Sequence, residues 1–337
     1  MTSEASTVRP KVAVIGTGGT ISSVGRHSLD LVDYVVNQRI YDVHELLASV
    51  PEAGQVADVE AVAFKAIPST AMGPGVWLDL VRVVHELGAR AVPPDGVVIT
   101  HGTASLEETA YFLNLALKVD FPVVLVGAQR PASGISTDAN INLVNAIRVA
   151  GDPAARGNGV LVVLNDEIHA AREVTKTATL RMQTFRSPDF GCLGHADCDR
   201  VAFYRQLLRP ACPGTEFSVD GLTALPRVDI SYAYAGADGA AIRGFVAAGA
   251  QGIVSAGFAP GLCTAGEREV LAEFPELIVV QSSRVGSGRV AAMTGLRATA
   301  DAVTADNLTP QKSRVLLMLA LTVTRDRAEI QRMFDTY

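Results

Sequence analysis

The chain has 337 residues and a formal net charge of −6. Its negative balance argues against a nucleic-acid partner, which needs a net cationic face, and its length favours two packed domains with a large buried interior. No run approaches the ~18 consecutive apolar residues of a membrane span. Four cysteines in a chain of this size fit a reducing compartment, and the polar first eleven residues lack the regions of a secretory signal, so we expect a cytoplasmic location.

Short apolar runs alternate with helix-like segments along the chain. Runs that are apolar on both faces are typical of parallel strands covered by helices on both sides, which predicts an α/β fold. The predicted strands are Val12–Ile15, Gly96–Thr100, Val123–Val126, Gly159–Leu164, Ile253–Ala256 and Leu277–Gln281.

The first explicit helix start follows the second of these strands. Ser105 with Glu108 three residues later has the pattern of a capping box, which predicts a helix beginning there. Residues 101–104 then lie at the carboxyl end of a strand. Ligands bind at that edge of open α/β sheets, because helix N-termini and loop amides converge there.

The alternation breaks between Asp199 and Pro226, a stretch with three prolines and no clear period. We interpret it as an interdomain linker. The predicted organisation is a large N-terminal catalytic α/β domain with a parallel sheet (1–200), a linker (201–225) and a smaller C-terminal α/β domain (226–337). The last domain ends in a helix that begins near Pro310.

The segment 16–21, GTGGTI, follows a buried strand and invites comparison with phosphate-binding loops. A dinucleotide fingerprint needs glycine where Ile21 stands, and no P-loop lysine follows. The glycines instead permit a tight turn that displays Thr20, whose hydroxyl could attack a carbonyl while nearby amides stabilise the oxyanion. The alternative is a glycine-rich turn with a capping threonine.

Two further residues could assist a threonine nucleophile. Thr103 lies at a second strand end, and Lys176 follows another apolar strand. A partly buried lysine with a lowered pKa can activate a hydroxyl. Taken alone, Lys176 could equally be a solvated surface lysine.

Five sequence blocks in the same order resemble the bacterial L-asparaginase/glutaminase family of threonine amidohydrolases. The resemblance covers nearly the whole chain. It implies the asparaginase-like two-domain fold, a small-molecule substrate, no cofactor, and a homotetramer built from close dimers with active sites at their interfaces. The blocks are GTGGTI, THGT-x-x-LEETAYFL, VGAQRP…STDANINLVNAI, GVLVVLND…REVTKT and TPQKSRVLL…QRMFDTY.

The resemblance also implies roles for individual residues. Thr20 matches the threonine that forms the acyl-enzyme, and Tyr34 matches the tyrosine of a mobile lid that assists it. Ser69 matches the serine that binds the substrate carboxylate. Thr103 and Lys176 match the second threonine and the lysine that activate water and polarise the site. Further positions expected to line the substrate are Gly19, Thr70, Gly102 and Ala104.

The chain departs from the family pattern where the family binds the substrate's α-ammonium group. The family aspartate after the second threonine is Ala104 here, and Ala259 stands at a family asparagine. The segment 285–295 has no acidic residue where a neighbouring subunit would lend one. An ammonium left unpaired in a buried site costs several kcal/mol, so we expect α-amino acids to bind poorly.

We therefore predict an asparaginase-like amidohydrolase, acting on linear amides that carry a carboxylate and no α-amino group, such as a dicarboxylic acid monoamide. In this reading Tyr34 and Lys176 carry protons and Thr103 orients water. The alternatives are a weak L-asparaginase, an esterase or lactonase on the same scaffold, and a non-catalytic ligand-binding paralogue.

We interpret other residues with reactive side chains as structural. Cys192, His195 and Cys198 include zinc-binding residue types, with Asp197 or Asp199 as a possible fourth ligand, but the spacing is not a standard one and we predict no metal.

We predict no catalytic role for three more groups of residues. His101 is read as a strand-end residue, and the pair Glu107 and Glu108 as first-turn acids that favour the helix dipole. Arg284 is a candidate for ordering a subunit interface.

Overall fold

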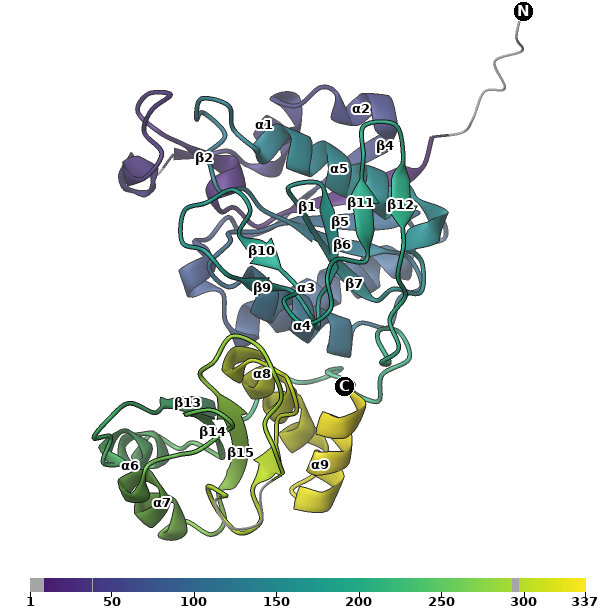
Figure 1. The fold of residues 1–337 in the computed structure, drawn as a ribbon. Coiled ribbons are helices and arrows are strands. Elements are labelled where there is room, and N and C mark those ends of the chain that lie inside the picture. Colours follow the sequence, from purple (N-terminus) through teal and green to yellow (C-terminus); the bar gives the residue numbers. More distant parts are fainter. Residues whose placement is uncertain (1–8, 38, 293–296) are drawn as a thin grey trace, which may run out of the picture.

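The N-terminal part of the chain builds an eight-stranded sheet in the order β12-β11-β8-β7-β6-β5-β1-β4 (Figure 1). The computed structural model describes residues 9–37, 39–292 and 297–337. The five strands from β7 to β4 run parallel, and β8, β11 and β12 add antiparallel pairs at one end. The strands are β1 Lys11–Gly16, β4 Asp58–Ala63, β5 Gly96–Thr100, β6 Val123–Val126, β7 Val160–Leu164, β8 Glu167–Ala170, β11 Gly194–Ala196 and β12 Val201–Phe203.

Helices cover both faces of this sheet, which explains why its strands are apolar on both sides. In β1, Ala13 and Ile15 pack on the face with α3 (Pro74–Gly88) and α4 (Leu106–Ala116). Val12 and Val14 pack on the opposite face. The helices of that face are α1 Val43–Ala48, α2 Ala53–Val56 and α5 Ala139–Gly151.

The C-terminal part forms a smaller sheet of four parallel strands in the order β13-β14-β15-β16. A separate apolar cluster lies beneath two of its helices, α6 and α7. The elements are β13 Val228–Tyr232, α6 Ala240–Ala247, β14 Gly252–Gly257, α7 Ala265–Ala272, β15 Ile278–Ser283, β16 Val303–Thr304, α8 Pro310–Val323 and α9 Arg327–Thr336.

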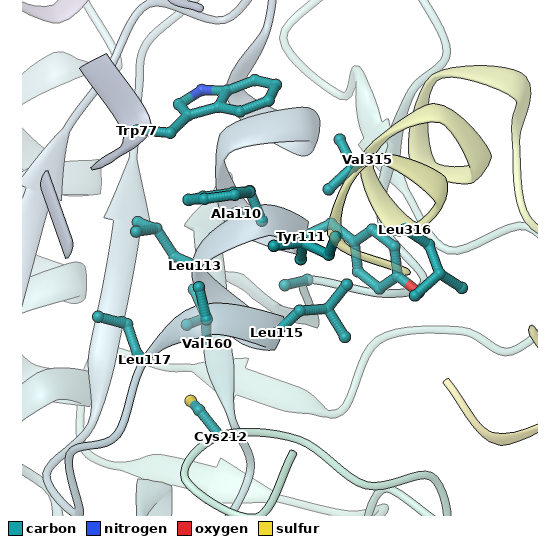
Figure 2. Close-up of a cluster of buried hydrophobic side chains, with 14 of the residues drawn as sticks. Trp77, Ala110, Tyr111, Leu113, Leu115, Leu117, Val160, Cys212, Val315 and Leu316 are labelled. Atoms are coloured by element: carbon teal, nitrogen blue, oxygen red, sulfur yellow. The ribbon is translucent and has the colours of Figure 1, made fainter. Parts of the chain in front are cut away.

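Helix α8 joins the two domains, because it packs on the small sheet and on α4 of the large domain (Figure 1). Figure 2 shows Tyr111 of α4 beside Leu316 of α8, within a cluster that also holds Trp77 and Val160. The apolar core is therefore continuous from the large domain into the small one.

The structure confirms the predicted fold class, and each of the six predicted strands is present within two residues of its expected bounds. Strand β12 pairs within the large sheet, so the first residues of the predicted linker are strand. No helix among the described residues is both long and apolar enough to cross a bilayer.

The capping box predicted at Ser105 is wrong, although α4 does begin at Leu106 with Ser105 as its N-cap. The Ser105 hydroxyl makes no capping bond. It donates instead to the backbone carbonyl of Ser69, at 2.6 Å. The Ser105 hydroxyl therefore binds a residue distant in the sequence instead of a backbone N–H of its own helix.

Candidate active site

The loops that carry the predicted catalytic residues converge beside the carboxyl end of β1. This strand pairs in parallel with β4 on one side and β5 on the other. The chain therefore crosses over β1 between β4 and β5, and a crevice opens where the strand order reverses. The turn after β1 brings Thr20 to this crevice, the segment after β4 brings Ser69, and the segment after β5 brings Thr103.

The turn after β1 depends on glycine. Gly19 has φ +91°, and a Cβ built there would lie 2.3 Å from the backbone nitrogen of Gly102. Only glycine therefore lets the β1 and β5 loops approach this closely. Thr20 follows at the start of a short 3₁₀ turn, Thr20–Ser22, partly exposed to the pocket.

Tyr34 reaches Thr20 from a segment that folds over the crevice. It lies in the 3₁₀ turn Asp33–Asn37, between the two strands of a small antiparallel ribbon, β2 (Ser23–Val24) and β3 (Arg39–Ile40). The Tyr34 phenol oxygen and Thr20 Oγ1 lie 2.8 Å apart and share a hydrogen bond. A proton can pass between these two hydroxyls without rearrangement of either side chain.

Ser69 lines the crevice from the segment after β4, at the start of the 3₁₀ turn Ser69–Ala71. Its buried hydroxyl accepts a hydrogen bond of 3.3 Å from the backbone N–H of Ala104. The 2.6 Å bond from Ser105 to the Ser69 carbonyl fixes the same turn to the start of α4. Thr70, beside it, is exposed to the pocket.

Lys176 enters from β9 (Thr175–Lys176), which pairs with β10 (Phe185–Arg186) outside the main sheet. Its Nζ donates to Thr103 Oγ1 at 2.7 Å and to Gln129 Oε1 at 3.4 Å. Thr103 in turn donates to Gln129 Oε1 at 3.3 Å. The lysine is therefore half-buried and bound to neutral oxygens.

Burial lowers the pKa of Lys176 from its ordinary value of 10.5, because the charged ammonium loses water. The charge of Glu107, in the first turn of α4, acts in the opposite direction and raises that pKa. Lys176 is consequently easier to deprotonate than a solvated lysine, as a proton acceptor requires.

A pocket of about 480 Å³ encloses these groups, and all nine residues predicted to act on or bind the substrate line it. Two cationic side chains, Lys176 and Arg39, face it, and none of its described lining residues carries a carboxylate. The pocket is therefore suited to an anionic ligand. The nine predicted residues are Gly19, Thr20, Tyr34, Ser69, Thr70, Gly102, Thr103, Ala104 and Lys176.

Sequence reasoning missed five of the described lining residues, Ser23, Val35, Arg39, Ile40 and Pro68, and also Gln129, which lies outside the lining. Gln129 follows β6, the neighbour of β5, and binds both Thr103 and Lys176. Gln129 belongs to the VGAQRP block at the end of a strand, and this position could have predicted it as a site residue. Arg39 in the ribbon lines the pocket mouth, and no pattern in the sequence marked it.

The other singled-out polar residues lie outside the pocket lining. His101 is fully buried with Nδ1 2.7 Å from the Gly102 carbonyl, and burial lowers its pKa to about 4, so the ring is neutral near pH 7. Glu107 lies in the first turn of α4 as predicted, and it is also buried and accepts a 2.9 Å bond from Gln311 of α8.

His195 lies in an antiparallel hairpin formed by β11 and β12. Cys192 Sγ lies 3.6 Å from His195 Nε2, whereas Cys198 is exposed in the hairpin turn. Within the described part of the chain, no group of three His, Cys, Asp or Glu residues is placed to hold a metal ion.

Two residues of the small domain were singled out for contacts with ligand or neighbouring subunit. Arg284 stacks over the ring of Phe258, with its guanidinium 4.3 Å from the ring centroid, and donates to the Ala233 carbonyl. Ala259 lies in the adjacent turn and does not line the pocket. Of the segment 285–295, residues 293–295 fall outside the described residues.

Both halves of the chain match family models. Residues 11–209 match the model described as Asparaginase, N-terminal, and residues 227–334 match the model described as Glutaminase/Asparaginase C-terminal domain.

Relatives match over nearly their whole length. The chain is 41% identical over 335 residues to a probable periplasmic L-asparaginase of Haemophilus influenzae, covering 97% of this chain and 93% of that protein. It is 37% identical over 338 residues to a glutaminase-asparaginase of Pseudomonas fluorescens biotype A, covering 99% and 92%.

A solved structure agrees in fold. The crystal structure of a probable cytoplasmic L-asparaginase from Campylobacter jejuni matches with a TM-score of 0.92 and 40% identity, over 98% of this chain and all of that one. With both domains matched and relatives aligned end to end, the chain belongs to the asparaginase/glutaminase family.

Proposed function

We propose that this protein is an amidohydrolase that forms an acyl-enzyme at Thr20, and that its substrate carries a carboxylate and an amide but no α-amino group. Hydrolysis of a C–N bond is the activity common to the L-asparaginases and glutaminase-asparaginases to which the chain is related. The observation that carries the finer proposal is the pocket lining: the hydrogen-bonded Thr20 and Tyr34 pair and Lys176 all face the cavity, and none of its described residues carries a carboxylate.

The proposed reaction has two halves. In the first, Thr20 Oγ1 bonds to the acyl carbon and its proton passes to the Tyr34 oxygen as the Tyr34 phenol gives its own proton to the leaving nitrogen. The C–N bond then breaks and ammonia departs. In the second, water bound by Thr103 adds to the ester and gives its proton to Lys176. The ester C–O bond breaks, the carboxylic acid leaves, and the proton held by Lys176 passes on to Thr20 Oγ1, so that both residues return to their starting state.

The substrate proposal depends on electrostatics at position 104. An α-ammonium group in this pocket faces Ala104 and two cations, and no described side chain of the lining neutralises it. A carboxylate finds the Ser69 turn and the positive charge of Arg39, which does not depend on the protonation state of Lys176. A dicarboxylic acid monoamide meets both conditions.

A matched panel tests the proposal: succinamate against asparagine, and glutaramate against glutamine, each assayed for ammonia release. We expect turnover of the des-amino amides and little of the amino acids. Mass spectrometry of quenched reactions should find the acyl group on the peptide containing Thr20. If only the amino acids were hydrolysed, the substrate proposal would be wrong, and if Thr20→Ala kept full turnover, the nucleophile would be wrong.

L-Asparagine hydrolysis is the second candidate, favoured by the names of the relatives at 41% identity. The same panel separates the two, since an L-asparaginase prefers asparagine to succinamate.

We also propose a cytoplasmic homotetramer of close dimers, on the basis of the family resemblance. Light scattering coupled to gel filtration measures the assembly. Cell fractionation decides the compartment, for which the relatives' names differ.

A further inference from the structure

A lysine of the small domain is buried beneath the active site. Lys312, in the first turn of α8, is 1% exposed. Its Nζ donates to the backbone carbonyls of Arg172, at 2.8 Å, and Val174. It forms no ion pair with a carboxylate of the described residues. The charges of Glu107 and Glu173 act on it without direct contact, and its Nζ lies 5.9 Å from the centroid of the Tyr111 ring. Burying an ammonium without a direct ion pair is costly, so its position calls for an explanation beyond stability.

The two carbonyls belong to the segment that carries the catalytic lysine. Residues 171–176 lead from β8 into β9, so Lys312 holds the backbone four and two residues before Lys176. Strand β9 itself has only two residues and pairs only with the equally short β10. The main sheet holds this segment at its start, where the backbone N–H groups of Ala171 and Val174 donate to the carbonyls of Val160 and Ala170, at 3.0 Å each. The bonds from Lys312 supply a further anchor to the carbonyls of the same segment.

The neighbouring residue of the same turn reaches the other half of the site. Gln311 Nε2 donates to Glu107 Oε1 at 2.9 Å, and Glu107 lies on α4, four residues after Thr103. Below this contact α4 and α8 are packed together, as Figure 2 shows for Tyr111 and Leu316. One turn of α8 thus touches both segments whose side chains meet in the Lys176 to Thr103 bond.

We propose that Lys312 is a positioning residue of the active site: from the small domain, its buried ammonium holds the 172–176 segment so that Lys176 reaches Thr103 at 2.7 Å. The small domain then contributes to catalysis within one chain, without touching the substrate. Displacement of Lys176 by even ~1 Å is sufficient to lower turnover up to about 10²-fold, because proton transfer needs a short, aligned contact.

Lys312→Met in the full chain tests this, because methionine keeps the unbranched stem and removes the donors. Arg314→Met is the matched control. Arg314 is another cation of the same helix turn, but its Nε donates to the Val228 carbonyl, at 2.8 Å, away from the 172–176 segment. Lys312→Gln, which retains an amide donor on a shorter stem, serves if the methionine variant does not fold.

We expect Lys312→Met to lower kcat about 10- to 100-fold with little change in KM, because the Ser69 turn is not bound by Lys312. Arg314→Met should leave both constants near wild type at a comparable loss of stability. Wild-type kcat in Lys312→Met, or an equal loss of kcat in Arg314→Met, overturns the proposal.

The kinetic experiment rests on the proposed function, so a second experiment measures the role of Lys312 without relying on turnover. Hydrogen exchange of the amides of residues 172–177 should accelerate in Lys312→Met and stay at the wild-type rate in Arg314→Met. If the wild type hydrolyses no amide, the proposed function fails while the exchange result still decides the role of Lys312. Unchanged exchange in Lys312→Met overturns that role.

Discussion

The Tyr34 phenol oxygen lies 2.8 Å from Thr20 Oγ1, although the two residues come from different segments: the turn after β1 and the ribbon that folds over it. This bond places a second hydroxyl directly against the proposed nucleophile. Its removal should affect the chemical step more than substrate binding, because the Ser69 turn, which we propose binds the substrate carboxylate, is bonded to Ala104 and Ser105 and not to Tyr34.

Tyr34→Phe should therefore lower kcat by about 10²- to 10⁴-fold, the usual contribution of a positioned acid or base, with a much smaller change in KM. Tyr204→Phe is the control, because that tyrosine is exposed and does not line the pocket. Steady-state ammonia release measures both. A Tyr34→Phe enzyme that keeps wild-type kcat assigns the proton transfer to another group.

The pH dependence of kcat/KM should report Lys176. As a base, this lysine acts in its neutral form, so activity should rise with pH through its pKa. Burial lowers that pKa, so the rising limb should lie below 10.5. Glu107→Gln should move the limb to still lower pH, because the Glu107 carboxylate raises the pKa of Lys176.

Glu108→Gln is the matched control for this shift, since Glu108 lies in the same helical turn and faces Arg314 at 3.9 Å instead. If the rising limb of the kcat/KM profile stays at the same pH in Glu107→Gln, or moves equally in Glu108→Gln, the assignment of that limb to Lys176 is contradicted.

Ala104→Asp should change the substrate preference. The new carboxylate supplies the missing partner for an α-ammonium group and also raises the pKa of Lys176, as a nearby opposite charge favours the protonated form. We expect the ratio of kcat/KM for asparagine over succinamate to rise at least ~10-fold, the effect of about 1.4 kcal/mol. Ala104→Asn, which has nearly the same shape without the charge, should leave the ratio closer to wild type. Equal ratios in the two variants would indicate a steric effect.

Lys312 should make stability depend on pH in the alkaline range. Burial lowers its pKa in the folded state from 10.5 to about 8, so between these values the unfolded chain binds more protons than the folded one. The free energy of unfolding therefore rises with pH across this window, by up to about 3 kcal/mol from this residue. Below pH 8 the lysine is charged in both states and contributes no slope.

Chemical denaturation of wild type and Lys312→Met at pH 7.5 and pH 10 measures this effect as a difference, which cancels the titration of other groups. The wild type should gain stability relative to the variant as pH rises. A constant difference between the two proteins would mean that Lys312 keeps an ordinary pKa.

The strands and the loops that follow them were predictable because their signal is local. The runs at Gly96–Thr100 and Val123–Val126 coincide with β5 and β6, since a strand buried on both faces needs an unbroken apolar run. The turn at Gly19 and Thr20 was equally predictable, because the close approach of Gly102 requires a glycine there. β4 and β13 escaped prediction: their partly exposed residues interrupt the apolar run.

Side-chain partners were harder to predict than strand ends. Ser105 has the sequence of a capping box, yet its hydroxyl binds the Ser69 carbonyl, 36 residues away. Glu107 looks like an ordinary first-turn acid but is buried against Gln311, 204 residues further along the chain. The Ser105 motif was overridden by a partner that only the folded chain supplies, whereas Glu107 keeps its first-turn position and gains such a partner.

The sequence by itself determined the α/β class, the strand ends and which residue types stand there, because periodicity and glycine placement act over a few residues. Only the tertiary structure decided that Tyr34 reaches Thr20, that Gln129 joins Thr103 and Lys176, and that Lys312 of the small domain lies beneath them. Those contacts depend on strand order and domain packing, which set distances between residues remote in the chain and leave no periodic trace in it.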